Sequence, residues 1–292
     1  MALLLAGASL LWGCVTVEWR VSVQGPAIPQ LGAVRALGIA VFDPVLKSND
    51  HLLIKVGGAF YNPIDFDGVT NRVALLVLTP DAASKFAVSR ESLSRACREV
   101  WVREIGTARP FDYAQSRGTE RARVMGQAPD GRAIPTGYDA VQAVPEPLGP
   151  MPASAAVAAD LCRGYRLDAL LAVEPVVYAE VGQVSSQRSD HAAGKEIDPG
   201  NFVLRAQVAY EYVLYDGRTG AVITDSSHTT PQYDTQQPPE TWIVDLGPSN
   251  PRAIVGFLKS PGFLGALSQA MQEASKPYLT LFRGCAVAVP RK

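Results

Sequence analysis

The sequence predicts an α+β (or α/β) fold, in which helices pack on one or both faces of a single mixed or mostly antiparallel sheet. Three observations lead to this prediction. Residues 36–42 form a continuous apolar run, which is typical of a strand buried on both faces. Residues 202–215 alternate between two sets of side chains and run into a glycine-containing turn, which predicts a hairpin. Three other segments repeat apolar residues every three or four positions, as amphipathic helices do.

The first third of the chain is predicted to contribute strands and then a helix. Residues 15–23 alternate as a strand does, and the buried strand over 36–42 follows. Residues 51–56 and 73–78 are further strand candidates. Ser89 is predicted to cap a helix whose apolar face consists of Leu93, Ala96, Cys97, Val100, Trp101 and Ile105.

The middle of the chain is predicted to form a second helix and a strand. The helix covers 154–165, with a helically spaced face of Ala156, Val157, Asp160, Leu161 and Tyr165. The strand covers 170–181 and contains Pro175, which favours an edge position or a bulge because proline has no N–H to donate. A polar loop is expected over 184–201.

The long strand over 202–215 is expected to bury every second side chain, namely Leu204, Ala206, Val208, Tyr210, Tyr212 and Leu214. A tight turn over 216–220 follows, in which Gly217 and Gly220 are expected to supply positive φ angles. Residues 221–227 return as the second strand of the hairpin.

The C-terminal part is predicted to contain the third helix. Residues 229–251 are polar and rich in proline. The helix covers 261–282, and Pro277 is expected to kink or end it. A last strand is a candidate over 285–289. The apolar face of the helix consists of Phe263, Leu264, Leu267, Ala270, Met271, Ala274, Tyr278 and Leu281.

The composition fits a soluble domain and argues against nucleic-acid binding. The chain has 292 residues, of which 47% are hydrophobic and 19% charged, and its formal net charge is −1. Nucleic-acid-binding domains usually carry a basic patch, and neither a Lys/Arg block nor an RNA-reading motif occurs here. The phosphate-binding patterns GxxxxGK and GxGxxG and the hydrolase pattern GxSxG are also absent.

The N-terminal segment MALLLAGASLLWGC resembles the signal of bacterial lipoproteins. Leu11 stands three positions before Cys14, and the small residue Gly13 stands directly before it, as in the lipobox of that family. The resemblance implies that a diacylglycerol is attached to the Cys14 thiol and that the signal is then cut off just before this cysteine. Val15 stands where inner-membrane lipoproteins often carry Asp, so the resemblance favours the periplasmic face of the outer membrane. The alternative is a short apolar helix or strand with an incidental cysteine.

The predicted domain organisation follows from this signal. Residues 1–13 are the cleaved signal segment, and residues 14–30 are a tether with the first strand. Residues 31–292 form a single α+β domain. Two long stretches rich in Gly, Pro, Asn and Asp, 43–72 and 106–152, are predicted to be excursions from it.

Three further stretches resemble uncharacterised bacterial envelope lipoproteins, distantly like the curli-secretion lipoprotein and the N-terminal domain of TolB. These stretches are VSVQGPAIPQLGAVRALGIAVF, LCRGYRLDALLAVEP and VAYEYVLYDGRTGAVITDS. The resemblance implies the fold and an envelope location, and it implies no enzyme activity. The two long excursions depart from the pattern of this group.

The cysteines after Cys14 are odd in number, so they cannot all pair with one another. Cys97 and Cys162 lie in helical patterns and Cys285 in an apolar strand-like tail. We expect no disulfide, because buried free cysteine is a common core residue. One disulfide remains the alternative in an oxidising compartment.

Few residues qualify as metal ligands or catalysts. The weak metal candidates are Asp65 and Asp67 in PIDFDG, but the closing Glu of a calcium loop is missing, so we expect a turn. His51 and His191 each follow an Asp, and we expect both pairs to be solvated loop residues. His228 is expected on the surface at a strand end. No catalytic residue and no cofactor-binding residue is predicted.

Two other sets of side chains are candidates for a function. Glu174 and Glu180 flank an apolar segment and could form an acid/base pair, although charges on an edge strand explain them as well. Tyr210 and Tyr212 share a strand face and are expected in the core, while Tyr215 opens the turn. A sugar or peptidoglycan platform is the alternative for these tyrosines.

The sequence therefore predicts an outer-membrane-anchored periplasmic lipoprotein that acts as a non-enzymatic binding or assembly module. Its expected partners are the membrane, through the lipid anchor, and envelope proteins, but not nucleic acid. No cofactor is expected. One alternative is a periplasmic metal-dependent hydrolase that uses Asp65, Asp67 and His51. The other is a subunit of an oligomeric secretion or channel complex.

Overall fold

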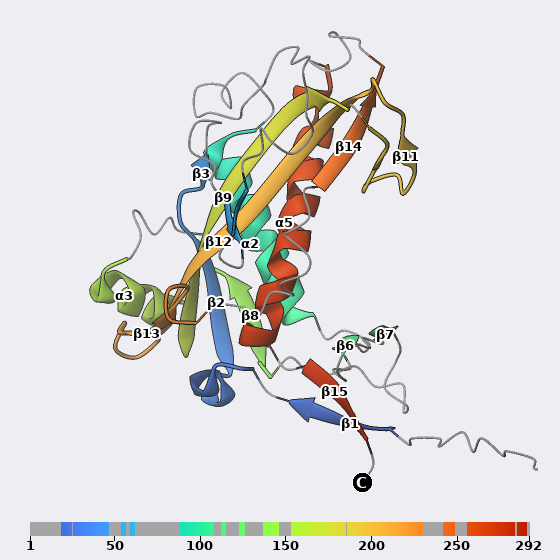
Figure 1. Cartoon of the computed structure of the whole chain (residues 1–292). Helices are drawn as coiled ribbons and strands as arrows, with labels where there is room; N and C mark the ends of the chain where they lie inside the picture. The colour runs from blue at the N-terminus through green and yellow to red at the C-terminus, as the bar shows by residue number, and fades with distance from the viewer. Residues whose placement is uncertain are drawn as a thin grey trace, which may run out of the picture. The chain divides into compact units, whose positions relative to one another are not determined.

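The computed structural model describes residues 19–24, 26–46, 54–56, 59–61, 88–107, 112–114, 123–125, 137–145, 153–184, 186–229, 242–248, 256–283 and 285–290 (Figure 1). The contacts divide the chain into two units. The smaller unit contains Met1–Gln24, Arg109–Ile134 and Cys285–Lys292, and the larger contains Gly25–Ala108 and Pro135–Gly284. The sequence led us to expect one domain over 31–292. Two of its segments, Arg109–Ile134 and Cys285–Lys292, group instead with the N-terminal segment.

The described residues of the smaller unit form two antiparallel strand pairs. β1 (Trp19–Gln24) pairs with β15 (Cys285–Pro290) along its whole length, which is why the C-terminal segment groups with the N-terminal one. β6 (Asp112–Ala114) pairs with β7 (Arg123–Met125). The strand expected over 285–289 is thus confirmed, and the β6–β7 pair lies within the predicted excursion 106–152.

The larger unit contains a seven-stranded sheet with the order β13-β12-β9-β2-β8, in which β14 also pairs with β12 and β3 with β9. β2 runs parallel to β8 and β9, while β12 runs antiparallel to β9, β13 and β14. The sheet is therefore mixed, which confirms the predicted fold class. Its strands are β2 (Ala36–Val41), β3 (Val45–Leu46), β8 (Ala140–Ala143), β9 (Ala169–Gln183), β12 (Phe202–Asp216), β13 (Val222–Asp225) and β14 (Trp242–Gly247).

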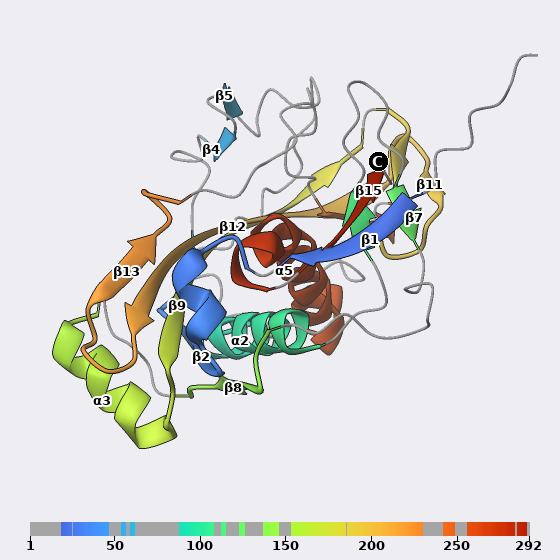
Figure 2. The same ribbon diagram turned by 90° about the horizontal axis from the view of Figure 1, so that it is seen from below.

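Two helices, α2 (Arg90–Gly106) and α5 (Pro261–Phe282), run side by side on one face of this sheet (Figure 2). Ser89 caps α2 as predicted, because its hydroxyl accepts the N–H of Ser92 at 3.1 Å. The predicted apolar faces of both helices pack into one buried cluster with the inward set of β12 side chains. The expected core face of β12 is thus confirmed.

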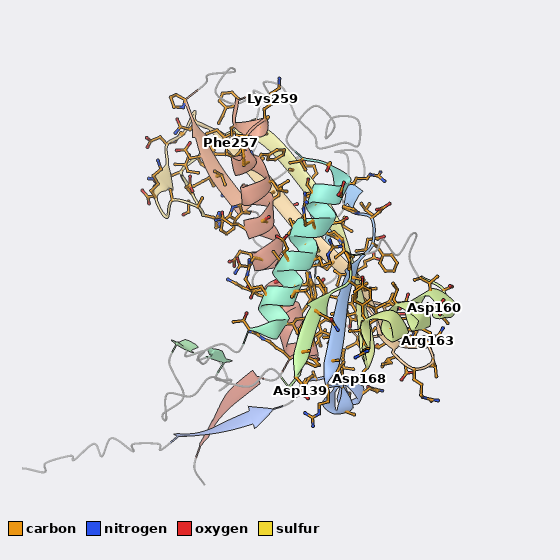
Figure 3. All side chains as sticks on the ribbon, turned by 180° about the vertical axis from the view of Figure 1, so that it is seen from behind. Asp139, Asp160, Arg163, Asp168, Phe257 and Lys259 are labelled. Carbon is orange, nitrogen blue, oxygen red and sulfur yellow. The ribbon has the colours of Figure 1, made fainter. Side chains whose placement is uncertain are left out.

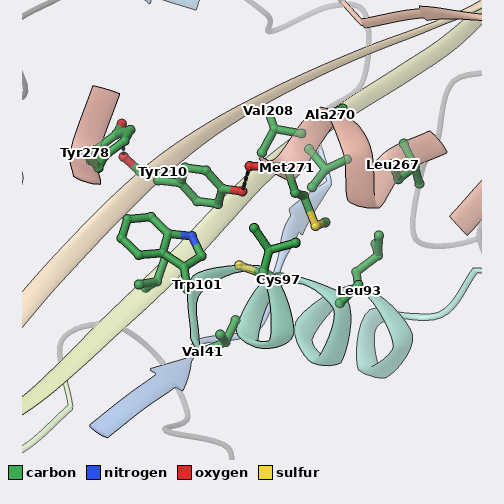
Figure 4. Close-up of a cluster of buried hydrophobic side chains, with 14 of the residues drawn as sticks. Val41, Leu93, Cys97, Trp101, Val208, Tyr210, Leu267, Ala270, Met271 and Tyr278 are labelled. Atoms are coloured by element: carbon green, nitrogen blue, oxygen red, sulfur yellow. Dashed lines mark hydrogen bonds between the residues drawn. The ribbon is translucent and has the colours of Figure 1, made fainter. Parts of the chain in front are cut away.

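An aromatic group forms the centre of this cluster (Figure 4). The Trp101 and Tyr210 rings meet edge to face, with centroids 5.1 Å apart and an interplanar angle of 89°. The Tyr210 hydroxyl donates to the carbonyl oxygen of Met271 at 2.7 Å, and the Tyr278 hydroxyl donates to that of Tyr210 at 2.9 Å. Burial raises the pKa of Tyr210 well above its ordinary value, so this hydroxyl stays protonated and keeps α5 fixed to β12.

The opposite face of the sheet is covered at one end by α3 (Ala155–Tyr165), and Ser154, which was expected inside this helix, is its N-cap. The face predicted for this helix is confirmed at Leu161 and Tyr165, which pack against the buried cluster, and is wrong at Val157, which is 41% exposed, and at Asp160. The side chains that α3 buries are Ala158, Ala159 and Cys162. Ala158 and Cys162 belong to one cluster with Phe42, Leu170 and Tyr215. The Tyr215 hydroxyl donates to the Ala153 carbonyl at 3.3 Å.

Asp168 joins three strand ends near this helix. Its Oδ2 accepts the N–H of Arg35 at 2.8 Å and that of Ala36 at 2.9 Å. Its carbonyl oxygen accepts the N–H of Gly217 at 2.8 Å. Figure 3 shows Asp168 beside Asp139, whose N–H donates to the Arg35 carbonyl at 2.8 Å. The starts of β2 and β9 and the turn after β12 are thereby held together.

The turn between β12 and β13 uses its two glycines differently. Gly220 has a φ of +69°, as expected for one glycine of this turn. Gly217 has no positive φ, so the reason predicted for this glycine is wrong. A Cβ on Gly217 would lie 2.5 Å from the carbonyl oxygens of Leu167 and Asp168, so the close approach of the two chain segments requires glycine there.

Of the alternatives given for the two prolines, the edge position of Pro175 and the helix end at Pro277 are wrong. Pro175 lies in an interior strand, because β9 pairs with β12 on one side and with β2 and β3 on the other. The parallel pairing passes from β2 to β3 between Val173 and Val176, so Pro175 sits where that ladder is interrupted. Pro277 does not end α5, which continues to Phe282.

Several short strands were missed or lie in predicted loops. β8 lies in the predicted excursion 106–152 and β14 in the proline-rich stretch 229–251, yet both pair with the main sheet. β4 (Ile54–Val56), which lies within the strand candidate 51–56, forms an antiparallel pair with β5 (Ala59–Tyr61) inside the excursion 43–72. The strand predicted over 73–78 lies outside the described residues.

Candidate functional site

A cluster of polar and titratable side chains lies where β14 meets the loop after β9. β10 (Arg188–Ser189) and β11 (Glu196–Ile197) form a small hairpin in that loop. Ile197 packs with Val184, Val203 and Ile243, which fixes the hairpin over the second face of the sheet. The tip of the hairpin, Asp190 to Lys195, then lies along β14. We call Asp190, His191, Lys195, Asn201, Trp242 and Asp245 the β14 corner.

Asp190 is the buried acid of the β14 corner, with 3% of its surface exposed. Its Oδ1 accepts the N–H of Ala193 at 2.6 Å, and its Oδ2 accepts the N–H of Asp245 at 2.8 Å. The expectation of a solvated loop residue was therefore wrong. Both carboxylate oxygens serve backbone donors, which offsets the cost of burying the charge.

His191 is bound to the backbone of β14 twice. Its N–H donates to the Ile243 carbonyl oxygen at 2.9 Å, and its Nδ1 accepts the Ile243 N–H at 3.0 Å. A ring that accepts at Nδ1 is neutral and carries its proton on Nε2. The ring also packs on Trp242, with centroids 5.1 Å apart and an interplanar angle of 31°. The expectation of a solvated histidine was wrong for the same reason as for Asp190.

Asp245 completes the β14 corner from the strand side. Its carboxylate accepts the Asn201 amide at 3.2 and 3.3 Å and the Gly247 N–H at 2.8 Å. Lys195 Nζ lies 3.8 Å from Asp245 Oδ2. These contacts tie β11, the start of β12 and β14 together, so the acids of the β14 corner act as backbone acceptors. No group of three or more His, Cys, Asp or Glu side chains within the described ranges is placed to hold a metal ion.

A second cluster superficially resembles a Ser-His-Asp triad. In the turn after β13, Asp225 Oδ1 lies 2.7 Å from His228 Nδ1 and accepts the Ser227 hydroxyl at 2.6 Å. Ser227 Oγ also lies 3.1 Å from His228 Nδ1. A catalytic triad requires the serine on Nε2 and the acid on Nδ1, whereas here both meet the same nitrogen.

This turn is therefore a hydrogen-bonded cap for the strand end. The Ser227 hydroxyl and the His228 side chain stabilise the ionised form of Asp225 and lower its pKa to about 2. His228 is 78% exposed in its side chain, so the surface position predicted for it is confirmed.

The two glutamates considered as an acid/base pair are too far apart. Glu174 and Glu180 are six residues apart on β9, which at about 3.3 Å per residue separates them by roughly 20 Å. Paired catalytic carboxylates lie within about 10 Å of each other. In the β9–β12 register, Glu174 is opposite Glu211 and Glu180 is opposite Arg205.

Other predicted residues divide into those that are described and those that are not. Cys97 and Cys162 are buried free thiols, and burial raises the pKa of both, to about 11 for Cys162. Tyr210 and Tyr212 lie in the core as expected. The predicted lipidation and metal residues lie outside the described residues, namely Cys14, His51, Asp65 and Asp67.

The sequence analysis missed the contribution of Lys195, Asn201, Trp242 and Asp245 to the β14 corner. The available signal was the short apolar run WIV at 242–244, aromatic and β-branched, within an otherwise polar stretch, which is typical of a strand.

The chain matches no protein-family model, and no relative was found among curated proteins. Among the described helices, none is long and apolar enough to span a bilayer.

Proposed function

We propose that this protein is a lipid-anchored, non-enzymatic binding or assembly module at the periplasmic face of a bacterial outer membrane. The observation that carries the proposal is the LWGC sequence at residues 11–14, which follows an apolar signal-like run. The diacylglycerol brings two acyl chains to the cysteine, and a further chain is typical of such lipoproteins, which together would give the stable attachment that one chain does not provide. The expected partners are the membrane and envelope proteins.

The chemistry of the described acids supports a module without catalysis. Asp168 and Asp190 accept backbone N–H groups, and Asp225 is engaged within its own turn. A general acid or base needs a titratable group that can reach a substrate proton. These side chains are instead used to join strands and turns.

The anchor is tested by intact-mass measurement of protein extracted from bacterial membranes. The wild type is expected to lack residues 1–13 and to carry acyl mass on Cys14. Cys14→Ala should abolish both changes, whereas Cys285→Ser is the matched control that should keep them. A wild-type protein with a free Cys14 thiol and an intact N-terminus would refute the lipid anchor.

Elemental analysis of the same material tests the absence of a metal-dependent activity. Stoichiometric metal that is lost in an Asp65→Asn, Asp67→Asn double variant would favour the hydrolase and contradict the proposal. Migration as a large ring in detergent would favour the channel subunit. A tethered module should show neither.

A further inference from the structure

The edge of β14 that faces away from β12 is covered by the tip of the β10–β11 hairpin. Trp242 and Val244 of β14 are opposite Ala206 and Leu204 of β12, and Ile243 turns its N–H and carbonyl oxygen to His191. Within the described ranges, this edge is held by three hydrogen bonds to Asp190 and His191. An uncovered strand edge presents free N–H and C=O groups that pair readily with another chain.

One of these three hydrogen bonds depends on the protonation state of a side chain near neutral pH. The Ile243 N–H donates to Nδ1 of His191 at 3.0 Å, which requires the neutral ring. An imidazolium carries N–H on both nitrogens and accepts from neither. Histidine is the side chain that ordinarily changes charge between about pH 5 and 8. Protonation therefore sets an N–H of the ring against the N–H of Ile243.

We propose that His191 is a pH-dependent latch on β14, whose protonation releases the Ile243 N–H at the outer edge of the strand. The inference stands apart from the proposed lipid anchor, because it rests on the β14 corner alone.

Charged residues lie on the loop of His191 and on the strands beside it. Asp190 and Lys195 lie on its own loop, Asp245 on β14, and Arg205 on β12 opposite Ile243. The adjoining hairpin also carries Arg188 and Glu196. The hydrogen bonds from the Asp245 N–H to Asp190 and from the His191 N–H to the Ile243 carbonyl do not involve the imidazole, so the release is local to the Ile243 N–H.

Backbone amide exchange, measured by NMR on the whole chain at pH 7.5 and 5.5, tests the latch. After correction for the intrinsic pH dependence of exchange, we expect the Ile243 amide to exchange about tenfold faster at pH 5.5, the effect of one net hydrogen bond. The Asp245 amide, whose acceptor is a carboxylate, should change little and serves as the internal control.

Two variants assign the effect to the imidazole. His191→Asn places an oxygen near the position of Nδ1, so it should keep the acceptor at both pH values and abolish the acceleration. His191→Phe keeps a ring against Trp242 but has no acceptor, so Ile243 should exchange fast at both values. Equal corrected exchange of Ile243 in the wild type at the two pH values would overturn the proposal. Wild-type acceleration in the Asn variant would overturn it as well, since another group would then titrate.

Discussion

Alanine substitutions at three glycines separate two free-energy costs of adding a side chain. One is the cost of a positive φ angle, and the other is the cost of a close contact of the Cβ atom. Gly194 has a φ of +64°, and nothing lies within 4 Å of the position that a Cβ would take, so alanine there meets only the backbone cost. Gly217 has no positive φ, but its Cβ would lie 2.5 Å from two carbonyl oxygens. Gly220 combines a φ of +69° with a Cβ position 1.8 Å from the Ala155 carbonyl oxygen.

The magnitudes follow from these distances. A left-handed backbone costs an L-residue about 1–2 kcal/mol, and overpacking costs about 1–3 kcal/mol. Gly194→Ala should therefore lower the free energy of unfolding by about 1 kcal/mol. Gly217→Ala should lower it by about 1–3 kcal/mol and Gly220→Ala by about 2–5 kcal/mol, because the atoms met at both sites are backbone atoms that cannot rotate away.

Urea unfolding followed by far-UV circular dichroism measures these differences, and an unchanged slope shows that the midpoint shift reports stability. Arg218→Ala is the control in the same turn, because its side chain is exposed and should matter by less than about 0.5 kcal/mol. If Gly220→Ala and Gly194→Ala agree within about 0.5 kcal/mol, then the close contact between the turn and α3 is wrong. A neutral Gly217→Ala would likewise refute the approach of the turn to the start of β9.

Three further predictions concern acids and thiols. Asp168→Ala should lower the free energy of unfolding by about 1–2 kcal/mol, because two backbone N–H groups lose their acceptor. Asp139→Ala, at an exposed neighbouring residue, should be nearly neutral. Equal urea midpoints for the two variants would contradict this prediction. The buried thiols of Cys97 and Cys162 should react with an aromatic disulfide reagent at pH 8 only after unfolding, and rapid labelling of native protein would refute their burial. The folded-state pKa of Asp225 is about 2, below its value of 3.8 without these contacts, so its contribution to stability is present above about pH 4 and is lost as the pH falls through 2. The stability gap between wild type and Asp225→Asn should therefore shrink from pH 5 to pH 2, and a constant gap would contradict the lowered pKa.

The elements predicted well from sequence are those whose pattern repeats over many residues. α2, α5 and β12 each show their buried face several times in succession, so chance apolar residues do not change the outcome. β2 was found because both of its faces are buried and its whole run is apolar. The mixed sheet with helices on its faces follows from these elements together.

Elements whose position is set by their neighbours were not found in this way. β8 has four residues and β14 six, and each is a strand because it pairs with β2 or β12. α3 illustrates a second limit. Small or apolar residues surround its first turns, so helical spacing offers more than one candidate face, and the sheet selects Ala158, Ala159 and Cys162.

The β14 corner shows why a site can escape a correct prediction of the fold. Asp190 and His191 stand in a polar stretch, and in such a stretch an Asp-His pair is typical of solvent-exposed loops. The backbone N–H groups that bind their side chains belong to residues 52 and 55 positions further along the chain. Those N–H groups face outward only because β14 takes its register from β12, which leaves Ile243 and Asp245 unpaired on that side. Assigning a role to His191 from sequence would thus have required knowledge of β14, its partner strand and its register. A shift of β14 by one residue against β12 would turn the Ile243 N–H away from His191 and remove the acceptor role of the imidazole. The same dependence makes Ile243→Pro a structural test. The substitution removes the N–H that His191 accepts but no N–H that pairs with β12, so β14 should remain paired with β12. Protonation of His191 then has no hydrogen bond to break at Ile243, so the pH dependence of this edge should disappear.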